Sequence, residues 1–356
     1  MKNQWMIYGA NGYSAQLALE KAVGQGYKPI LAGRNQGAIK ALAESYGLEA
    51  RVFSLNEQTA VAAQLSDVKI VSHCAGPFSE TAAPMMRACI ESGTPYTDIT
   101  GEIEVFELAQ GLDGEAREAG VVLCPGVGFD VIPTDCIAAA LKAEMPDATH
   151  LCLGFQGLNV LSPGTAKTMV ESISEGMKVR RNRKIIQVPP SFEARNIDFG
   201  SGARSASVIP WGDLATAYWH TDIPNITVYT PRQSGKASDL LLPVVQKLMS
   251  SRILKNFARK RIEKSVQGPD EQVRASGDTK VWGEVTNDQG DKVTCRATTP
   301  NGYTVTMDGI ILTAAFFLEY QGDGGCFTPS QLMGAQLIER LPGAGALVIE
   351  RTTSSP

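Results

Sequence analysis

The chain opens on two hydrophobic patterns of different period. Residues 5–8 are apolar without alternation, which is typical of a strand buried on both faces. After the glycine-containing turn GANGYSA, apolar side chains recur at helical spacing, at Ala15, Ala18, Leu19, Ala22 and Val23. Gly26 follows at the position of a helix-ending glycine. The pattern therefore predicts a strand, a tight turn and a helix.

The same alternation continues over about the first 125 residues. Further apolar runs predict strands at 28–33, 49–55, 68–76, 95–101 and 120–126. Helical spacing between them predicts helices around 39–46, 82–89 and 102–119. Strands that alternate with helices favour an α/β fold with a parallel, doubly wound (Rossmann) sheet.

After Pro133 the pattern becomes irregular. It predicts helices at 134–144, 165–176, 237–264 and 305–320, and strands at 150–155, 184–188, 215–221 and 225–230. Residues 279–287 and 291–299 predict an antiparallel hairpin. A final helix is expected over 327–341, with Thr328 as its N-cap and Pro329 at its first position.

These patterns give three expected parts. Residues 1–130 form the Rossmann domain, and residues 131–327 form an α+β domain for substrate binding and dimerisation. Residues 328–356 form a helix and tail, which we expect to pack back on the first domain.

Composition narrows the class of protein. The 356 residues are 43% hydrophobic and 20% charged, as in an ordinary globular protein, and the formal net charge of −4 argues against nucleic-acid binding. Seven scattered cysteines without a C-x-x-C pair predict reduced core thiols, and three histidines argue against a metal site. Neither a signal peptide nor a membrane-spanning segment is predicted, so we expect a soluble cytoplasmic protein.

The first turn is the strongest candidate for ligand binding. Gly9 allows a tight turn, Gly12 lets a ligand approach the backbone, and Ala15 keeps the helix close to the strand. The N–H groups of the first helical turn would then face a pyrophosphate. A plain strand-to-helix turn that needs glycines is the alternative, and the repeated alternation favours a dinucleotide.

The end of the second strand favours NADP over NAD. The sequence there is LAGRNQ, with Arg34 and no acidic residue before Glu44. An acidic residue would bind the ribose hydroxyls of NAD, whereas a guanidinium can bind the 2′-phosphate of NADP. Ser14 can add a hydrogen bond, and the alternative makes Arg34 a solvated loop residue.

The fourth strand ends in HCAGPF, where we expect the nicotinamide half of the cofactor. Ala75 and Gly76 leave space for the ring, and Pro77 fixes the loop. We interpret His73 as a structural residue.

The motifs GANGYSA, LAGRN, CAGPF, GTPYTDITGE and PGVGFDVIPTD resemble those of the saccharopine dehydrogenase-like oxidoreductases, a family that includes trans-acting enoyl reductases. The resemblance implies an N-terminal NADP-binding Rossmann domain and a C-terminal domain that shapes the substrate cleft and often the dimer. It implies cofactor contacts from Gly9, Asn11, Gly12, Tyr13, Ser14, Arg34, Asn35, Ala75, Gly76 and Pro77. The family name does not specify the substrate, and no cluster of Arg and Lys for a multi-carboxylate amino acid is evident.

Hydride transfer to a carbonyl, imine or enoyl group also needs a proton source. Polar residues that could serve near the strand ends are Asp98, Thr100, Glu102, Asp130, Asp135, Thr165, Lys167, Tyr218 and His220. Each has a structural alternative, such as a cap, a turn or a solvated surface position. The preferred candidates are Asp130, Lys167 and His220, and the sequence does not select among them.

Two cationic stretches, 178–184 and 252–264, remain. They are either charged outer faces of packed helices or a surface for anionic lipid or a lipidated carrier. Three functions follow as hypotheses: an NADP-dependent oxidoreductase of a small or lipidic substrate, an enoyl reductase acting on an acyl chain, or a non-catalytic NADP(H)-binding sensor. A homodimer is expected in each case.

Overall fold

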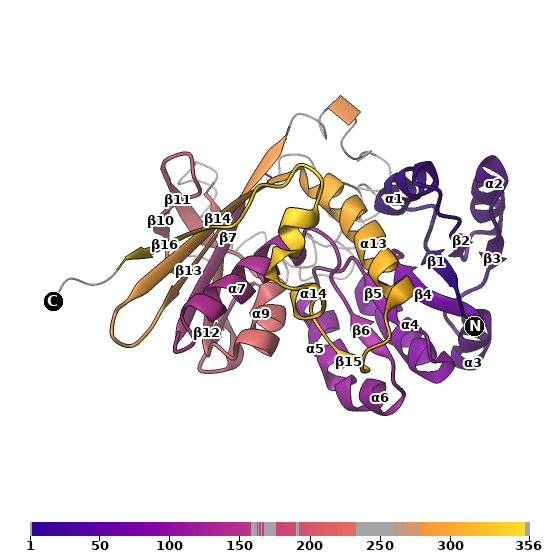
Figure 1. Ribbon diagram of the computed structural model, residues 1–356, viewed down its shortest axis with the longest axis horizontal. Helices are drawn as coiled ribbons and strands as arrows, with labels where there is room; N and C mark the ends of the chain where they lie inside the picture. Colours follow the sequence, from indigo (N-terminus) through magenta and orange to yellow (C-terminus); the bar gives the residue numbers. More distant parts are fainter. Residues whose placement is uncertain are drawn as a thin grey trace. The chain divides into compact units, whose positions relative to one another are not determined.

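A computed structural model describes residues 2–157, 162, 164, 166, 176–189, 192–232, 261, 265, 268, 271–272 and 277–352. The chain divides into two compact units (Figure 1). The first contains Met1–Ile132 and Tyr303–Leu332, and the second contains Pro133–Gly302 and Met333–Pro356.

The described residues of the first unit form a seven-stranded parallel sheet in the order β15-β6-β5-β4-β1-β2-β3. Its strands are β1 Gln4–Tyr8, β2 Ile30–Gly33, β3 Ala50–Val52, β4 Val68–His73, β5 Tyr96–Asp98, β6 Val122–Cys124 and β15 Gly325–Cys326. The strand order reverses between β1 and β4, because β2 follows on one side of β1 and β4 lies on the other. The predicted Rossmann sheet is confirmed, with its switch point at the carboxyl ends of β1 and β4.

Helices cover both faces of this sheet (Figure 1). They are α1 Tyr13–Gly24, α2 Gln36–Tyr46, α3 Gln58–Gln64, α4 Phe78–Ser92, α5 Ile103–Gly111, α6 Asp113–Glu118 and α13 Gly302–Glu319. Helices α1, α2 and α13 share one apolar core with the strands, which includes Leu19, Ile39 and Ile310. Lys21 of α1 also forms an ion pair with Asp308 of α13. Helix α13 is therefore part of the first unit.

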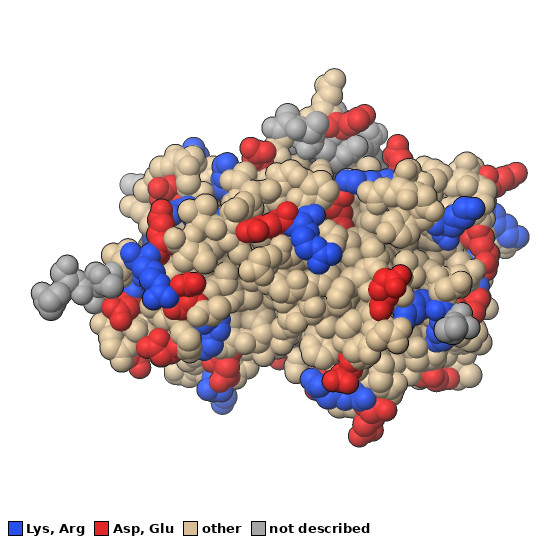
Figure 2. All heavy atoms as spheres, viewed as in Figure 1, with Lys and Arg blue, Asp and Glu red and all other residues tan. Residues whose placement is uncertain are grey.

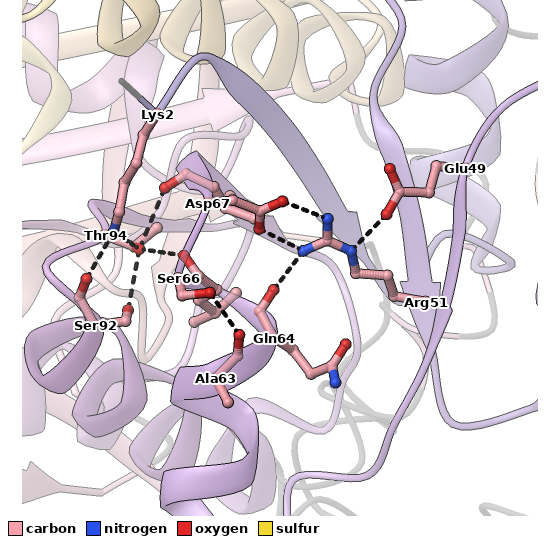
Figure 3. Close-up of polar contacts among 11 residues, drawn as sticks. Lys2, Glu49, Arg51, Ala63, Gln64, Ser66, Asp67, Ser92 and Thr94 are labelled. Atoms are coloured by element: carbon pink, nitrogen blue, oxygen red, sulfur yellow. Dashed lines mark hydrogen bonds and ion pairs between the residues drawn. The ribbon is translucent and has the colours of Figure 1, made fainter.

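Polar contacts hold the amino end of the sheet (Figure 3). Just before β1, the Nζ of Lys2 donates to the carbonyl oxygens of Ser92 (2.6 Å) and Gly93 (3.1 Å), at the end of α4. Arg51 of β3 forms two hydrogen bonds to Asp67, which precedes β4, at 2.7 and 2.8 Å. These contacts join the strand starts and lie at the edge opposite the switch point.

The described residues of the second unit form a mixed nine-stranded sheet whose main path is β10-β11-β12-β7-β13-β14-β16, with β8 paired to β12 and β9 paired to β8. Its strands are β7 His150–Gln156, β8 Met177–Arg181, β9 Lys184–Val188, β10 Arg195–Asp198, β11 Ala203–Val208, β12 Asn225–Pro231, β13 Asp278–Thr286, β14 Lys292–Pro300 and β16 Val348–Thr352. Helix α7 (Ile132–Glu144) packs on β13, because a Cβ at Gly283 would lie 2.4 Å from the Ile137 side chain. The expected α+β architecture, including the hairpin β13–β14, is confirmed.

The predicted strand at 215–221 is wrong, because these residues lie in helix α9 (Asp213–Thr221). The short apolar alternation Ala215, Ala217, Trp219 suggested a strand, but Leu214, Ala217 and Thr221 are buried at helical spacing. The structure does not describe enough of 165–176 and 237–264 to test the helices predicted there.

The predicted final helix over 327–341 is divided in two. Helix α14 covers Pro329–Met333, and a 3-10 helix covers Ala335–Arg340. Gly334, with a φ of +83°, separates them. Thr328 caps α14 as expected: its hydroxyl accepts from the Gln331 amide at 3.3 Å, and Gln331 accepts from the Thr328 amide at 2.8 Å.

The expected domain boundaries need correction after residue 302. The residues of α13 and β15 were expected in the second domain, but α13 covers the first sheet and β15, which was not predicted, pairs with β6. The tail was expected on the first domain, but β16 pairs with β14 in the second sheet. A hydrophobic pattern predicts an element, whereas its partner depends on tertiary pairing.

Two kinds of feature are absent from the part of the chain that the structure describes. No helix there has both the length and the hydrophobicity needed to cross a membrane. No group of three or more His, Cys, Asp or Glu side chains there could hold a metal ion.

Candidate functional site

Gly9 lies where β1 and β4 meet at the switch point. Its φ is +79°, and a Cβ added there would lie 2.7 Å from both the nitrogen and the Cβ of Ala75. Only glycine adopts this conformation without strain, and only glycine fits this space. The two strand ends therefore approach as closely as the backbone permits.

The start of α1 lies beside this contact. Gly12 is the N-cap, has no side chain with which to cap the helix, and donates its N–H to the Gly9 carbonyl at 2.9 Å. The first turn contains no acidic residue. Asn11 is exposed, and its carbonyl accepts from Gln16 Nε2 at 2.9 Å. Such a helix start favours an anionic ligand, because its N–H groups carry a partial positive charge.

The next two residues of the turn, Tyr13 and Ser14, are partly exposed. The Tyr13 ring packs edge-on against Tyr303 of α13, with ring centroids 5.4 Å apart. The start of α13 therefore lies next to the start of α1.

Arg34 and Asn35 follow β2 and differ in their surroundings. Arg34 is exposed, and its positive charge opposes the effect of burial, which raises the pKa of Tyr8 to about 12. The Oδ1 of Asn35 accepts from the Ala38 amide at 3.1 Å and caps α2. Arg34 thus presents a guanidinium, while the carbonyl oxygen of Asn35 already has a structural partner.

Residues 74–77 connect β4 to α4. Gly76 is exposed, Ala75 and Pro77 are partly exposed, and the Thr81 hydroxyl lies 2.6 Å from the Ala75 carbonyl and 3.0 Å from the Pro77 carbonyl. His73 is fully buried, with its Nε2 3.0 Å from Thr81 Oγ1. Burial lowers the pKa of His73 to about 3, so the imidazole is neutral. This agrees with its interpretation as a structural residue.

Glu102 has a role that the sequence did not indicate. It begins α5, as expected, but its carboxylate accepts from the amides of Phe78 (3.1 Å) and Ser79 (2.7 Å) at the start of α4. The signal in the sequence is Pro77, because a helix that begins after proline receives no side-chain cap from that residue.

Asp98 connects the ends of β5 and β6. Its Oδ1 accepts from the amides of Thr100 (3.0 Å) and Gly126 (2.8 Å), and its Oδ2 accepts from the Tyr96 hydroxyl at 2.6 Å. Burial raises the pKa of Asp98 to about 6, and these hydrogen bonds act in the opposite direction. Its role is to position the two loops.

Asp130 follows β6 and lies against the β5 loop. A Cβ at Gly101 would lie 2.6 Å from Asp130 Oδ2. The Asp130 side chain is partly exposed, and burial raises its pKa to about 7. This carboxyl can both hold and release a proton near neutral pH.

The other two candidate proton donors are elsewhere. His220 lies on α9 in the second unit, with its Nδ1 3.3 Å from Asp135 Oδ1 of α7. Lys167, like Thr165, lies outside the described residues. In the first unit, the ten cofactor candidates follow β1, β2 and β4, and Asp130 follows β6, so all lie at the carboxyl edge of one sheet.

The cationic stretch 178–184 forms the β8–β9 hairpin rather than a helix. Arg180 is buried, donates from Nε to the Leu214 carbonyl at 2.6 Å, and packs on the Tyr218 ring at 4.1 Å. Arg183 forms two hydrogen bonds to Asp222. On the face in Figure 2, basic and acidic side chains of the described residues are interspersed. Residues 252–264 are almost entirely outside the described residues, so the lipid-contact hypothesis stays a prediction.

The strand order, the Gly9–Ala75 contact and the uncapped start of α1 define the first unit as a dinucleotide-binding domain. Residues 5–124 match the family model described as the saccharopine dehydrogenase NADP binding domain. The resemblance predicted from the sequence motifs is therefore confirmed for this domain, and the match indicates NADP(H) as its cofactor.

Curated relatives match part of the chain. A human saccharopine dehydrogenase-like oxidoreductase is 24% identical over 212 residues, covering 52% of this chain and 49% of the relative. A trans-acting enoyl reductase of Mycobacterium bovis is 28% identical over 157 residues, covering 41% and 38%. The chain thus matches about half the length, or less, of these curated relatives.

One solved structure shares the fold over the whole chain. It is the apo saccharopine dehydrogenase (L-Glu forming) of Saccharomyces cerevisiae, with a TM-score of 0.65, 14% identity, and coverage of 99% of this chain and 100% of that one. At this identity the likeness supports a common fold only.

Proposed function

We propose that this protein is an NADP(H)-dependent oxidoreductase that transfers a hydride between the cofactor and a small or lipidic substrate. The observation that carries the proposal is the carboxyl edge of the first sheet. A helix start suited to a pyrophosphate, an exposed guanidinium and a carboxyl with a raised pKa all lie along that edge. The names of the relatives, which are oxidoreductases and enoyl reductases, support the same class.

The residues at this edge fit NADP(H). The Gly9 and Gly12 backbone and the first turn of α1 would hold the pyrophosphate. Arg34 would bind the 2′-phosphate, since no acidic residue lies in the first turn of α2 to repel it. Residues 75–77 would lie along the nicotinamide ring. The bound cofactor supplies the hydride.

Among the residues that the structure describes, we propose Asp130 as the proton donor. Reduction of a carbonyl or imine leaves a negative charge on oxygen or nitrogen, which a nearby acid neutralises. With a pKa of about 7, a fraction of Asp130 carboxyls is protonated at neutral pH. The partial exposure of the side chain gives a substrate access to it.

Enoyl reduction on a hydrophobic acyl chain is the second candidate. The observation that favours it is the name of the Mycobacterium bovis relative. This version adds contact with a lipid surface or an acyl carrier to the proposal. Both versions include a homodimer in the cytoplasm. Light scattering of the purified protein would test the oligomeric state.

Cofactor binding is the first experiment. Titration with NADPH and NADH, followed by nicotinamide fluorescence, should give tighter binding of NADPH. Arg34→Ala should weaken NADPH binding by roughly 10- to 100-fold and leave NADH binding unchanged, because one charge-assisted contact is worth about 1.5–3 kcal/mol. Lys40→Ala, which removes another exposed cation on α2, is the matched control.

Turnover is the second experiment. Carbonyl, imine and enoyl substrates, including acyl thioesters, are offered with NADPH, and loss of its absorbance is followed. Oxidation of NADPH in the presence of one substrate class would identify the reaction. Tight NADPH binding without turnover on any class would instead support the sensor hypothesis, and no binding of either cofactor would contradict the whole proposal.

A further inference from the structure

Two helices begin at the carboxyl edge next to the switch point, and their first turns differ. Helix α1 begins at Gly12 without a side-chain cap or an acidic residue. Helix α4 begins after Pro77, and the Glu102 carboxylate accepts from its first two amides. One helix start is thus available to an anion, and the other already holds a carboxylate of this chain.

The loop before α4 is held from several directions. Thr81 contacts the carbonyls of Ala75 and Pro77 from within α4. Gly9 lies against Ala75. Glu102 binds the amides that directly follow Pro77. The loop 75–77 is therefore held at its end by a side chain from the β5 loop, 23 to 24 residues after the two amides that it binds.

Glu102 is itself fixed by hydrogen bonds. Its amide donates to Thr100 Oγ1 at 3.1 Å, and the Thr100 amide donates to Asp98 Oδ1 at 3.0 Å. The same Asp98 oxygen accepts from the Gly126 amide at 2.8 Å. Glu102 is 9% exposed, so its contacts to α4 are shielded from water. One network thus links the ends of β4, β5 and β6.

We propose that Glu102 is a positioning residue for the nicotinamide ring, an inference that rests on the proposed function. Its carboxylate fixes residues 75–79 and gives the start of α4 a negative charge. The phosphates of the cofactor are thereby directed to α1, and the uncharged nicotinamide amide faces residues 75–77. Glu102 touches neither the reacting atoms nor the phosphates and acts through the loop.

Three variants test this role. Glu102→Ala removes both contacts to α4, and Glu102→Gln keeps one carbonyl oxygen as an acceptor. Glu104→Ala removes an exposed carboxylate from the same helix α5 and is the matched control. For each, NADPH affinity is measured together with the emission maximum and lifetime of the bound dihydronicotinamide, and the melting temperature is recorded.

Glu102→Ala should change the emission of the bound ring while weakening NADPH binding only about threefold or less, because the phosphate contacts at α1 and Arg34 remain. Glu102→Gln should lie between this variant and the native protein, and Glu104→Ala should match the native protein. Arg34→Ala should show the opposite split, with a large loss of affinity and unchanged ring emission.

A lower melting temperature of Glu102→Ala with native ring emission would overturn the inference, because it would mean a purely structural cap. The inference would also be overturned if Glu102→Ala does not fold and Glu102→Gln, the milder change, leaves both ring emission and NADPH affinity at native values. Failure of the native protein to bind NADPH is a different result, and it would overturn the proposed function itself.

Discussion

The Asp130 carboxyl illustrates how a single residue acquires its chemistry from its neighbours. Gly101 leaves room for it, since a Cβ there would lie 2.6 Å from Oδ2. Burial beside this backbone raises the pKa of Asp130 to about 7. Any larger residue at 101 would displace the carboxyl, so Gly101 and Asp130 form one unit.

The pH dependence of turnover tests this residue. Because the raised pKa of about 7 makes the protonated form the majority below pH 7, reduction should slow above pH 7, by about tenfold per pH unit. Asp130→Asn should lose this dependence and lower kcat by roughly 10²- to 10⁴-fold. The measurement is kcat/KM against pH for the native protein and the variant.

Asp323→Asn, an exposed carboxyl in the same unit, is the control and should keep the native profile. A native profile in Asp130→Asn would show that another group donates the proton.

Several residues near the strand ends could be predicted from the sequence, because glycine and proline have strong backbone preferences and arginine carries a positive charge that suits a phosphate. Gly9 and Pro77 could be assigned to a turn and a loop on that basis. The contacts of Glu102 with α4 could not, because they join residues 23 to 24 positions apart in the chain. Asp135 and His220 likewise meet only through tertiary packing of α7 on α9.

At the scale of elements, β4 and α4 are joined around one neutral imidazole. The His73 ring packs against the rings of Tyr8 (5.5 Å), Phe78 (5.4 Å) and Tyr96 (6.0 Å). Burial lowers its pKa from 6.5 to about 3. The folded protein therefore excludes a proton that the unfolded chain binds below pH 6.5.

Acid unfolding should report this exclusion. Between about pH 6.5 and 3 the unfolded chain binds more protons than the folded protein. The free energy of unfolding should therefore decrease as the pH is lowered, by up to about 1.4 kcal/mol per pH unit from His73 alone. His73→Gln should show a shallower slope over this range in urea titrations, at a lower overall stability. His150→Gln, which removes an exposed histidine of β7, is the control for the loss of an imidazole. Equal slopes in the native protein and His73→Gln would contradict this account.

The pattern predicted most elements of the first unit but not all of them. Strands β1 to β6 of the first sheet were predicted, whereas β15, which has only two residues, was not. Helix α3 was missed, because its seven residues bury only Val61 and Ala62 and give no visible period. Helix α9 was mistaken for a strand, because nine residues rich in alanine and aromatic side chains fit both periods.

At the scale of the whole molecule, the first unit is built from two separate parts of the chain. Helix α13 and β15 return to the first sheet after the first segment of the second unit, Pro133–Gly302. Ile310 and Phe317 of α13 are fully buried in the core that α13 shares with α1. The two segments are close at their junction, since the Phe129 amide donates to Thr306 Oγ1 at 3.1 Å.

Shortened chains test this arrangement. Residues 1–132 alone should be unstable and bind a hydrophobic dye, because the apolar surface under α13 is uncovered. The same residues joined to 303–332 by a Gly/Ser linker of about eight residues should fold, since such a linker spans roughly 15 Å. Circular dichroism and NADPH titration compare the two, and full NADPH affinity in residues 1–132 alone would contradict the prediction.

The late position of α13 in the chain also determines when the first unit can complete its core during translation. The first segment of this unit ends at Ile132, and its second segment begins at Tyr303, 171 residues later in the chain (303 minus 132). At translation rates of 5–20 residues per second, one apolar face of the nascent sheet stays uncovered for roughly 10–30 s before α13 is synthesised. Chaperone capture of the growing polypeptide should therefore peak in that window and end when the late helix emerges.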